Sequence, residues 1–333
     1  MALVNILHMN PGDGELSYSK NSLLQETAIR NAVPILKHSI KGIASYGFFK
    51  DCITVADLGC SSGTNTLLVV SNIIDIVHEV CQENNRGVPQ FQVCLNDLFG
   101  SFYSRLFPNK SLHLVHCATS NHWLSQMPQG VENNGSNIYM AKTSPPNVYQ
   151  AYGKQFHTDF TKFLRMRSEE VVHGGSMVLT ILSRSLVDPA SDDSCASIDL
   201  LGQSLIDMVK EGLVKGEDIN SFNIPLYFPC EDEVRDIIES EGSFSIENLT
   251  VFKVNWDPHD TDYTNMNDSN ELSQVHGKNT SNVLRVALEP LLVSHFGNSI
   301  IHVLFKKYEK HVADHLSKKK TRHFFLTISL TKK

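Results

Sequence analysis

The chain has 333 residues, of which 41% are hydrophobic, and a formal net charge of -7. That length holds one large α/β core with a sizeable addition, and the hydrophobic share is that of an ordinary soluble globule, which excludes an intrinsically disordered chain. The acidic balance argues against a nucleic-acid groove, because Lys and Arg are scattered except for a short run at 318–320 near the C-terminus.

The cysteines and the N-terminus predict the compartment. The seven cysteines include no Cys-x-x-Cys pair and their number is odd, which favours reduced, mostly buried thiols. No apolar run approaches the ~18 residues of a membrane span. Residues 1–9 lack a basic segment and a small-residue cleavage site. We therefore expect a cytoplasmic protein that binds neither membrane nor nucleic acid.

The most informative stretch is 55–65, which reads Val-Ala-Asp-Leu-Gly-Cys-Ser-Ser-Gly-Thr-Asn. An apolar strand stops at Asp57, and Gly59 and Gly63 lead into a predicted helix over 66–80. Glycines at such a turn let backbone amides approach a ligand at a helix N-terminus, so a nucleoside cofactor is expected. The spacing fits neither the dinucleotide fingerprint nor a P-loop, and is typical of S-adenosylmethionine (SAM)-dependent methyltransferases. An ordinary strand-to-helix turn is the alternative.

The next strand, predicted over 91–95, closes on Asn96 and Asp97. A carboxylate at the end of the second strand of such a fold can accept hydrogen bonds from both ribose hydroxyls of a nucleoside. Asp97 is therefore our candidate ribose ligand. A helix-capping role is the alternative for this residue.

Several further motifs occur in the order found in the plant SABATH methyltransferases, and the match runs from Leu7 to Leu330. The motifs are His8-Met9-Asn10, Ser17-Tyr18-Ser19-Lys20-Asn21-Ser22 with Gln25, Leu95-Asn96-Asp97-Leu98, Gly100-Ser101-Phe102-Tyr103, Arg105-Leu106-Phe107-Pro108 and His122-Trp123-Leu124-Ser125-Gln126. The chain resembles this family, which methylates salicylate, benzoate, jasmonate and related small acids, with a branch that methylates xanthine nitrogens. The resemblance implies an α/β fold with a Rossmann-like methyltransferase sheet and a helical cap.

The resemblance also implies site residues, with SAM as the cofactor. Its expected cofactor residues are Tyr18, Asp57, Gly59, Cys60, Asn65, Asp97, Leu98, Ser101 and Phe102. Its expected substrate residues are Gln25, Thr119, His122 and Trp123, where Gln25 and the Trp123 indole N–H would hold a carboxylate. From the residues alone, Gln25 could be an exposed helix residue, and His122 and Trp123 could belong to the core.

Two substitutions predict the character of the substrate pocket. Position 119 is usually Tyr in the family and is Thr119 here, and Asn121 stands where an apolar residue is common, so we expect a roomier and more polar pocket. A carboxylate is already ionised and a sulfonium already activated, so methyl transfer needs no general base and we nominate no catalytic residue. The alternative is a xanthine N-methyltransferase with His122 orienting the purine, but Thr119 removes its stacking partner.

The chain departs from the family after Leu98. Family members continue there with a helix and a strand before the Gly-Ser-Phe-Tyr element, whereas this chain reaches Gly100 at once. One βα unit is missing, and because the lost strand is an edge strand in this class, the sheet stays whole but exposes apolar surface and a backbone edge. A relative that binds the cofactor without transferring a methyl group is therefore a further alternative.

The remaining elements follow from periodicity and turn signals. After a first helix over 23–43 and the elements above, we predict a strand over 112–117, a helix over 148–172 with a Gly stop at 174–175, strands over 177–182, 244–254 and 324–330, and helices over 198–211, 231–241, 284–296 and 300–311. The polar segment 258–278 is expected to be a mobile loop. The expected division is a core of 1–183 with 244–254 and 284–333, and a mostly helical cap of 184–283.

A metal and a dimer complete the expectations. The resemblance places a possible Mg²⁺ beside Asn134, Asn220, Phe222 and Asn223, but the family acid in this element is Asn220 here, and a hard cation favours carboxylate oxygen. We also expect the chain to form a homodimer. Its expected binding partner is a small carboxylic acid, which is the substrate.

Overall fold

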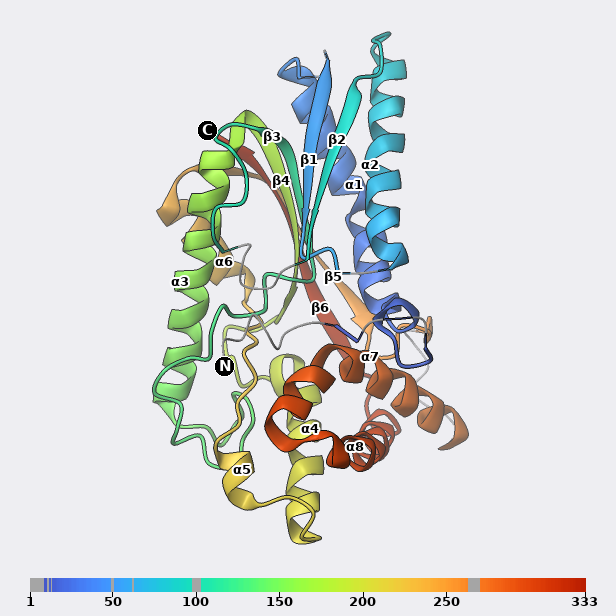
Figure 1. Ribbon diagram of the computed structural model, residues 1–333, viewed down its shortest axis with the longest axis vertical. Helices are drawn as coiled ribbons and strands as arrows, with labels where there is room; N and C mark the ends of the chain where they lie inside the picture. Colours follow the sequence, from blue (N-terminus) through green and yellow to red (C-terminus); the bar gives the residue numbers. More distant parts are fainter. Residues whose placement is uncertain are drawn as a thin grey trace.

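The computed structural model describes residues 9–10, 12, 14–48, 51–61, 63–97, 103–262 and 270–333, which surround one mixed sheet (Figure 1). Within these residues the sheet has six strands in the order β2-β1-β3-β4-β6-β5. The strands are β1 (Cys52–Leu58), β2 (Gln90–Asn96), β3 (Leu112–Ala118), β4 (Val171–Ser183), β5 (Phe244–Asn255) and β6 (Arg322–Lys332). The first four run parallel, so their carboxyl ends meet at one edge, and β6 runs antiparallel to both neighbours.

Helices cover both faces of the sheet and its carboxyl edge. They are α1 (Leu23–Ser45), α2 (Thr64–Glu83), α3 (Pro146–Glu170), α4 (Asp192–Lys210), α5 (Gly216–Asn220), α6 (Glu231–Glu241), α7 (Asn270–Phe296) and α8 (Ile301–Leu316), with the 3-10 turns η2 (Tyr18–Lys20) and η3 (Asn298–Ile300). Figure 1 shows α1 and α2 on one face and α3 and α6 on the other. None of these described helices has the length and apolarity needed to cross a bilayer.

The core follows from apolar periodicity. Residues of α1 and α2 such as Ile40, Ile73 and Val77 pack against the fully buried Ile53 and Val55 of β1. On the other face, aromatic residues of α3 form a continuous stack. Burial of each such side chain stabilises the fold by about 1.5–3 kcal/mol, which is why the two helix layers hold the sheet as a rigid platform.

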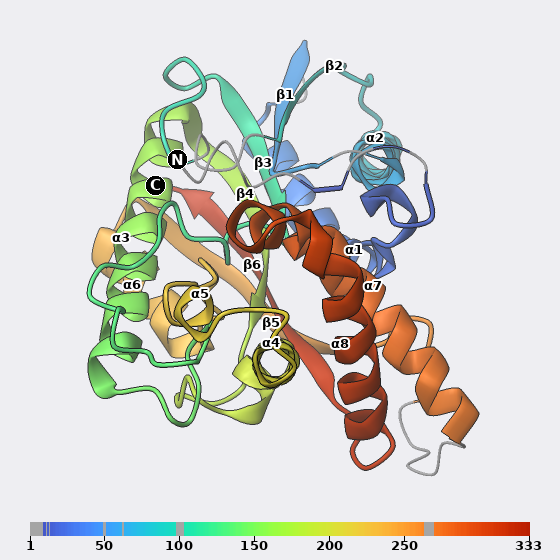
Figure 2. The same cartoon turned by 60° about the horizontal axis from the view of Figure 1, so that its bottom comes forward.

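A group of four helices, α4, α5, α7 and α8, lies at the carboxyl ends of the parallel strands (Figures 1 and 2). Helix α8 packs on both α7 and α4. The packing differs from the division expected from the sequence, because α7 and α8 join α4 although 284–316 was assigned to the core, and α6 joins α3 and β5 although it was assigned to the cap.

Most predicted elements are confirmed within a few residues, and two predictions are wrong. Gly174 and Gly175 do not stop a helix; they lie inside β4, where Gly174 has φ +78° and a Cβ would meet the Tyr46 ring at 2.4 Å. The register of β3 on β4 is irregular at this point, so the glycines permit a local bend in a strand.

The second wrong prediction concerns the loop 258–278. Residues 263–269 lie outside the described residues, but 270–278 form the start of α7. Polar side chains stabilise this end: the buried His276 Nδ1 lies 2.6 Å from Asp257 Oδ2, and Asn279 Nδ2 donates to the same oxygen at 3.0 Å. The polar composition therefore reflects a tertiary contact rather than a solvated loop.

Strand β2 ends the sheet, as expected from the missing βα unit. No other strand pairs with its outer edge in the described part of the chain, and the Leu95 side chain is 53% exposed. Parallel pairing of β2 with β1 is nevertheless complete from Cys52–Gln90 to Leu58–Asn96. The missing unit thus leaves the pairing of β1 intact and uncovers only the outer side of β2.

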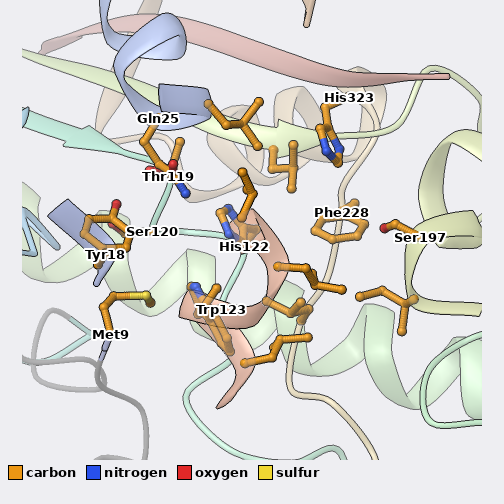
Figure 3. Close-up of a pocket in the computed structure, with 18 of the residues that line it drawn as sticks. Met9, Tyr18, Gln25, Thr119, Ser120, His122, Trp123, Ser197, Phe228 and His323 are labelled. Atoms are coloured by element: carbon orange, nitrogen blue, oxygen red, sulfur yellow. The ribbon is translucent and has the colours of Figure 1, made fainter. Parts of the chain in front are cut away.

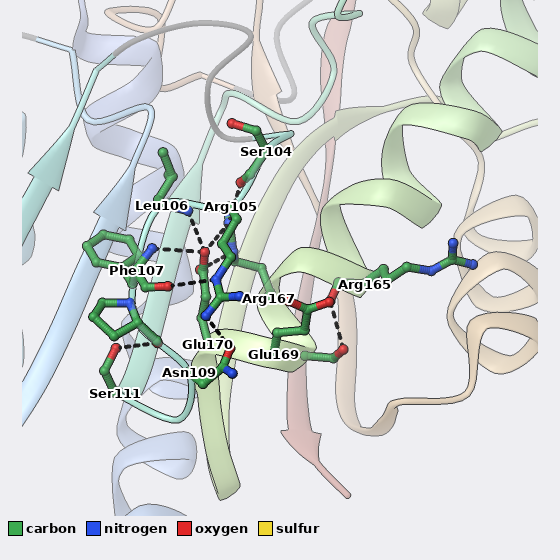
Figure 4. Close-up of polar contacts among 12 residues, drawn as sticks. Ser104, Arg105, Leu106, Phe107, Asn109, Ser111, Arg165, Arg167, Glu169 and Glu170 are labelled. Atoms are coloured by element: carbon green, nitrogen blue, oxygen red, sulfur yellow. Dashed lines mark hydrogen bonds and ion pairs between the residues drawn. The ribbon is translucent and has the colours of Figure 1, made fainter.

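The chain that follows the shortened connection is anchored on the end of α3 (Figure 4). The fully buried Arg167 and Glu170 form an ion pair, with Nε 2.8 Å from Oε2. Glu170 Oε1 accepts hydrogen bonds from the backbone N–H groups of Leu106 and Phe107 at 2.5 and 3.0 Å. Arg167 donates to the Ser104 carbonyl at 2.7 Å. This cluster, which we call the α3 clasp, fixes residues 104–107 against the core.

Candidate functional site

The turn after β1 is built for a close approach of backbone. Gly59 has φ +71°, and a Cβ on it would lie 2.1 Å from Ser120 Oγ. Its backbone N–H and that of Cys60 donate to the Asn96 carbonyl at 2.6 and 3.1 Å, while the Ser120 hydroxyl donates to the Gly59 carbonyl at 3.0 Å. A side chain at position 59 would break these contacts. The turn can therefore join the ends of β1, β2 and β3 only if this residue is glycine.

The N-terminal segment closes over this turn. Gly63, at the start of α2, has φ +113°, and a Cβ there would meet Ser19 Cβ at 3.1 Å. The buried Asn65 side chain donates to the Ser22 carbonyl at 3.1 Å, which ties α2 to the start of α1. Tyr18 is only 7% exposed and lines the same cavity as Asn65. Residues 17–22 therefore form a lid over the strand ends.

Acidic groups surround the same space. Asp57 is buried, and its Oδ1 lies 2.8 Å from His116 Nδ1. Partial burial raises the pKa of Asp97, and a hydrogen bond from the Ser61 backbone N–H opposes the rise. Burial, helped by the charges of Asp97 and Asp57, raises the pKa of Tyr18, so the phenol stays neutral.

The Cys60 thiol is no nucleophile in this setting. Burial raises its pKa to about 12, and the neighbouring charges of Asp57 and Asp97 add to the effect. A thiol that stays protonated at neutral pH is chemically inert, so Cys60 serves as a wall of the site.

Five of the expected cofactor residues line one narrow cavity beneath the lid. They are Tyr18, Asp57, Gly59, Cys60 and Asn65. Asp97 stands at the end of β2, close enough for its charge to affect Tyr18 and Cys60. The expected contacts Leu98, Ser101 and Phe102 lie outside the described residues. The narrow cavity, which we call the turn cavity, thus gathers every described residue of the predicted set except Asp97, which lies near it.

A second and larger cavity adjoins it (Figure 3). It encloses about 940 Å³, open solvent at its mouth included, and all four expected substrate residues line it: Gln25, Thr119, His122 and Trp123. Tyr18, Gln25, Gly59 and Thr119 line both cavities. A group carried by a ligand in the turn cavity would therefore meet a second ligand at these four residues. We call the larger space the acceptor cavity.

The acceptor cavity has polar atoms but no formal charge. None of its described lining residues is Lys, Arg, Asp or Glu. Burial lowers the pKa of His122 to about 3, so the imidazole is neutral at pH 7, and its Nδ1 has no hydrogen-bond partner. Gln25 Oε1 is likewise buried and without a partner. Such atoms are costly unless an occupant or water bonds to them.

Trp123 is both a core anchor and a wall of this cavity. Its indole is 4% exposed, its backbone N–H donates to the Ser120 carbonyl at 3.0 Å, and the Tyr103 hydroxyl donates to its carbonyl. The core role considered as an alternative is therefore present together with the pocket position. Asn121, in contrast, is 1% exposed and lines neither cavity, so the expectation that it makes the pocket more polar is wrong.

Thr119 has a strained backbone that matches its position between the cavities. Its φ is +56°, a region that non-glycine residues seldom adopt, and its N–H donates to the Thr180 carbonyl at 2.8 Å. Non-glycine residues in this conformation tend to cluster at functional sites. The bond to β4 holds the side chain at the junction of the two cavities.

The residues of the possible Mg²⁺ site do not fit a metal. The Asn134 side chain donates to Asn223 Oδ1 at 2.9 Å and accepts from the Ser144 hydroxyl at 2.6 Å, so these amide oxygens are already bonded. Asn220 accepts a bond from Ser136, and the Phe222 ring packs on His295 at 5.0 Å. In the described ranges no group of three or more His, Cys, Asp or Glu could hold an ion. The asparagines form a structural network instead.

Comparison with known proteins gives the family. A family model described as SAM dependent carboxyl methyltransferase matches residues 4–100 and 98–333. The two matched stretches meet where the βα unit is missing. The chain is 41% identical to S-adenosyl-L-methionine:benzoic acid/salicylic acid carboxyl methyltransferase 3 of Petunia hybrida, covering 100% of this chain and 99% of the relative. It is 38% identical to probable jasmonic acid carboxyl methyltransferase 1 of Theobroma cacao, with both chains covered completely.

A solved structure agrees with the fold. The loganic acid methyltransferase with SAH (S-adenosylhomocysteine) superposes with a TM-score of 0.84 at 29% identity, over 98% of each chain. The expected Rossmann-like methyltransferase fold and the resemblance to the SABATH family are therefore confirmed. The chain belongs to the SAM-dependent carboxyl methyltransferases, with SAM as its methyl donor.

Proposed function

We propose that this enzyme methylates a carboxylate oxygen of a small acid of the salicylate, benzoate or jasmonate type. The observation that carries the proposal is the junction of two cavities at Tyr18, Gln25, Gly59 and Thr119. Relatives that match this chain over their full length are named as carboxyl methyltransferases of such acids. An acid in the acceptor cavity would present its carboxylate at this junction.

We assign the turn cavity to SAM. Asp97 would accept the ribose hydroxyls, and Asp57, Gly59, Cys60 and Asn65 would surround the methionine portion under Tyr18. These residues fit the group, because a cationic, nucleoside-bearing ligand suits a cavity with two carboxylates beside it. Bound SAM would supply a methyl group on an activated, positively charged sulfonium.

The chain's own residues would position the acid and exclude water. Gln25 Nε2 and the Trp123 indole N–H are neutral donors that would hold the carboxylate at the junction. His122 is kept neutral by burial, so it would orient the acid without adding a charge. The lid and the apolar walls keep water away from the reacting groups, and no proton has to move because the carboxylate is already ionised.

The experiment pairs acid turnover with cofactor binding. The Gln25→Glu variant keeps the side chain's shape but places a negative charge beside the substrate carboxylate, so acid turnover should fall at least about tenfold. Its affinity for SAH should change little, because SAH has an uncharged thioether where SAM has the sulfonium, so the new charge meets no cation there. Gln82→Glu, the same change on the exposed face of α2, is the matched control and should leave both quantities unchanged.

Trp123→Phe tests the second donor. It keeps most of the ring but removes the N–H, so methylation of acids should fall while SAH affinity stays. Equal loss of both would assign Trp123 to the core alone. Methylation of xanthines in place of acids, or SAH binding without transfer to any acid in a screen with labelled SAM, would overturn the proposed function.

A homodimer and a cytoplasmic location are further parts of this proposal. Sedimentation of the purified chain and fractionation of cells that express it would test them. A monomer or a membrane-associated pool would contradict these expectations without affecting the assignment of the substrate class.

A further inference from the structure

One wall of the acceptor cavity has two hydroxyl groups that the chemistry above does not use. Thr280 of α7 and Tyr308 of α8 both line the cavity and are 4% and 0% exposed. Neither Thr280 Oγ1 nor the Tyr308 hydroxyl has a hydrogen-bond partner. Buried polar atoms in folded proteins are nearly always paired, so two unpaired hydroxyls in one cavity wall call for an explanation.

Close packing of α7 on α8 brings Thr280 and Tyr308 into one wall of the cavity. A Cβ on Gly277 would lie 2.6 Å from the Glu309 carbonyl, so only glycine permits this approach. One turn further along α7, the Ser281 hydroxyl donates to the Phe305 carbonyl at 3.3 Å. Thr280 and Tyr308 lie between these two contacts on antiparallel helices. The helix pair therefore places both residues in the same wall of the cavity.

A series of contacts links this wall to the His323 side of the cavity. His276, one turn before Thr280, is bonded to Asp257, the residue after Trp256, and the Trp256 ring lies 6.1 Å from the His323 ring. Figure 3 shows His323 on the side of the cavity opposite Tyr18. The two hydroxyls thus belong to the His323 side, whereas Gln25 and Trp123 hold the proposed carboxylate position.

The same wall carries no charge. Burial lowers the pKa of His323 to about 4, so its imidazole is neutral at pH 7. An ionised group on the substrate would have no counter-charge there, whereas a neutral donor or acceptor could bond to both hydroxyls.

We propose that Thr280 and Tyr308 form a second polar anchor, which selects acids that carry an uncharged hydroxyl or carbonyl group at the end remote from the carboxylate. This inference rests on the proposed function and names the substrate class more narrowly. A purely hydrocarbon acid would leave both hydroxyls unpaired, and a dicarboxylate would bury an unpaired charge, so both should be poor substrates.

The test compares matched acids. The first pair is 3-oxocyclopentaneacetate and cyclopentaneacetate, and the second is 4-hydroxybenzoate and benzoate. We expect the wild-type enzyme to prefer the polar member of at least one pair in kcat/KM. Thr280→Val and Tyr308→Phe remove one hydroxyl each with little change of shape. Each should lower kcat/KM for the polar acid about five- to tenfold and leave the apolar acid unchanged.

A second readout separates substrate contact from a structural role. Because the Tyr308 hydroxyl is unpaired in the free protein, Tyr308→Phe should not lower the melting temperature. Tyr152→Phe is the matched control, since the buried Tyr152 hydroxyl donates to the Ile224 carbonyl at 2.9 Å, and its loss should lower the melting temperature without changing the preference between acids.

The outcomes distinguish this inference from the proposed function. If no acid is methylated at all, the proposed function fails. If acids are methylated without preference for the polar members, only the polar anchor is overturned. Equal loss for both members of a pair, or a lower melting temperature in Tyr308→Phe, would also overturn it, because either result would assign the hydroxyl to the fold.

Discussion

The α3 clasp should determine both the stability of the chain and the order of its site. In the Glu170→Gln variant the side chain keeps its shape and one oxygen for the N–H groups of Leu106 and Phe107. It loses the negative charge that lies 2.8 Å from Arg167 Nε. Arginine side chains stay protonated in proteins, so the substitution leaves the fully buried Arg167 cation without its counter-ion.

The expected loss is large because both partners are fully buried. Breaking a buried pair by removing one member costs about 3–5 kcal/mol, a large share of the ~5–15 kcal/mol that stabilise a native protein. At roughly 2–4 °C per kcal/mol for a large domain, the melting temperature should fall by about 10 °C. The double variant Arg167→Met with Glu170→Gln removes the stranded charge and should recover more than half of the loss.

Urea and thermal unfolding measure the effect, with a neighbouring residue as control. Glu169 forms an exposed pair with Arg105 at 3.4 Å, so Glu169→Gln should change the unfolding free energy by less than about 0.5 kcal/mol. Acid turnover should fall in Glu170→Gln below the melting transition, because residues 104–107 follow Tyr103, whose hydroxyl bonds the Trp123 carbonyl. Equal stability of Glu170→Gln and Glu169→Gln would show that the buried ion pair does not stabilise the fold.

Three further predictions concern the cofactor end. Asp97→Ala should weaken SAH binding by ~1.5–3 kcal/mol in calorimetry, and an unchanged affinity would discard its ribose role. In the wild type, partial burial raises the pKa of Asp97 above its ordinary 3.8. Ribose hydroxyls would donate to the ionised carboxylate. The affinity for SAH should therefore be full above the raised pKa and decline as the pH falls through it. Grafting the family's missing βα unit between Leu98 and Gly100 should raise the melting temperature and SAH affinity together. The graft covers the exposed side of β2, and each Å² of apolar surface that it buries stabilises the fold by ~25 cal/mol. If neither rises, the short connection is an adaptation of this chain.

Local signals predicted the fold where a single residue determines the backbone. The turn at Gly59 could be predicted because its positive φ and its close approach to Ser120 require glycine, whatever the rest of the chain does. Gly174 and Gly175 carry the same signal, yet they bend a strand rather than end a helix. Glycine marks an unusual backbone position, and only the pairing of β3 with β4 decides which element contains it.

The start of α7 shows the opposite case. Residues 270–278 are polar and lack apolar periodicity, so the sequence predicts a loop. Their helix is held by distant partners, since His276 bonds Asp257 and Gly277 packs on the backbone of α8. Tertiary contacts of this kind outweigh local propensity, and no window of the sequence contains them.

The candidate site divides in the same way. The roles of Tyr18, Gln25, Thr119, His122 and Trp123 were predicted from the motifs shared with the SABATH family, and the last three also follow a strand end, where α/β sheets bind ligands. The residues of the opposite wall were missed. They come from α7, α8 and the last strand, where Thr280, Tyr308 and His323 look like ordinary helix and strand residues. Only a count of unpaired buried atoms separates these hydroxyls from the core.

The position of the missing unit explains why the acid end of the site is preserved. The junction of the two cavities depends on β1 and β3, which stay in the middle of the sheet, and on the bonds from Gly59 and Cys60 to the Asn96 carbonyl. Those bonds also fix the end of β2 from which Asp97 extends. The missing unit leaves uncovered the outer side of β2 and shortens the segment after Asp97. We therefore expect it to affect binding of the nucleoside part of the cofactor. We therefore expect selection among acids to depend on α1, α7, α8 and the loop after β3, none of which belongs to the segment where the unit is missing.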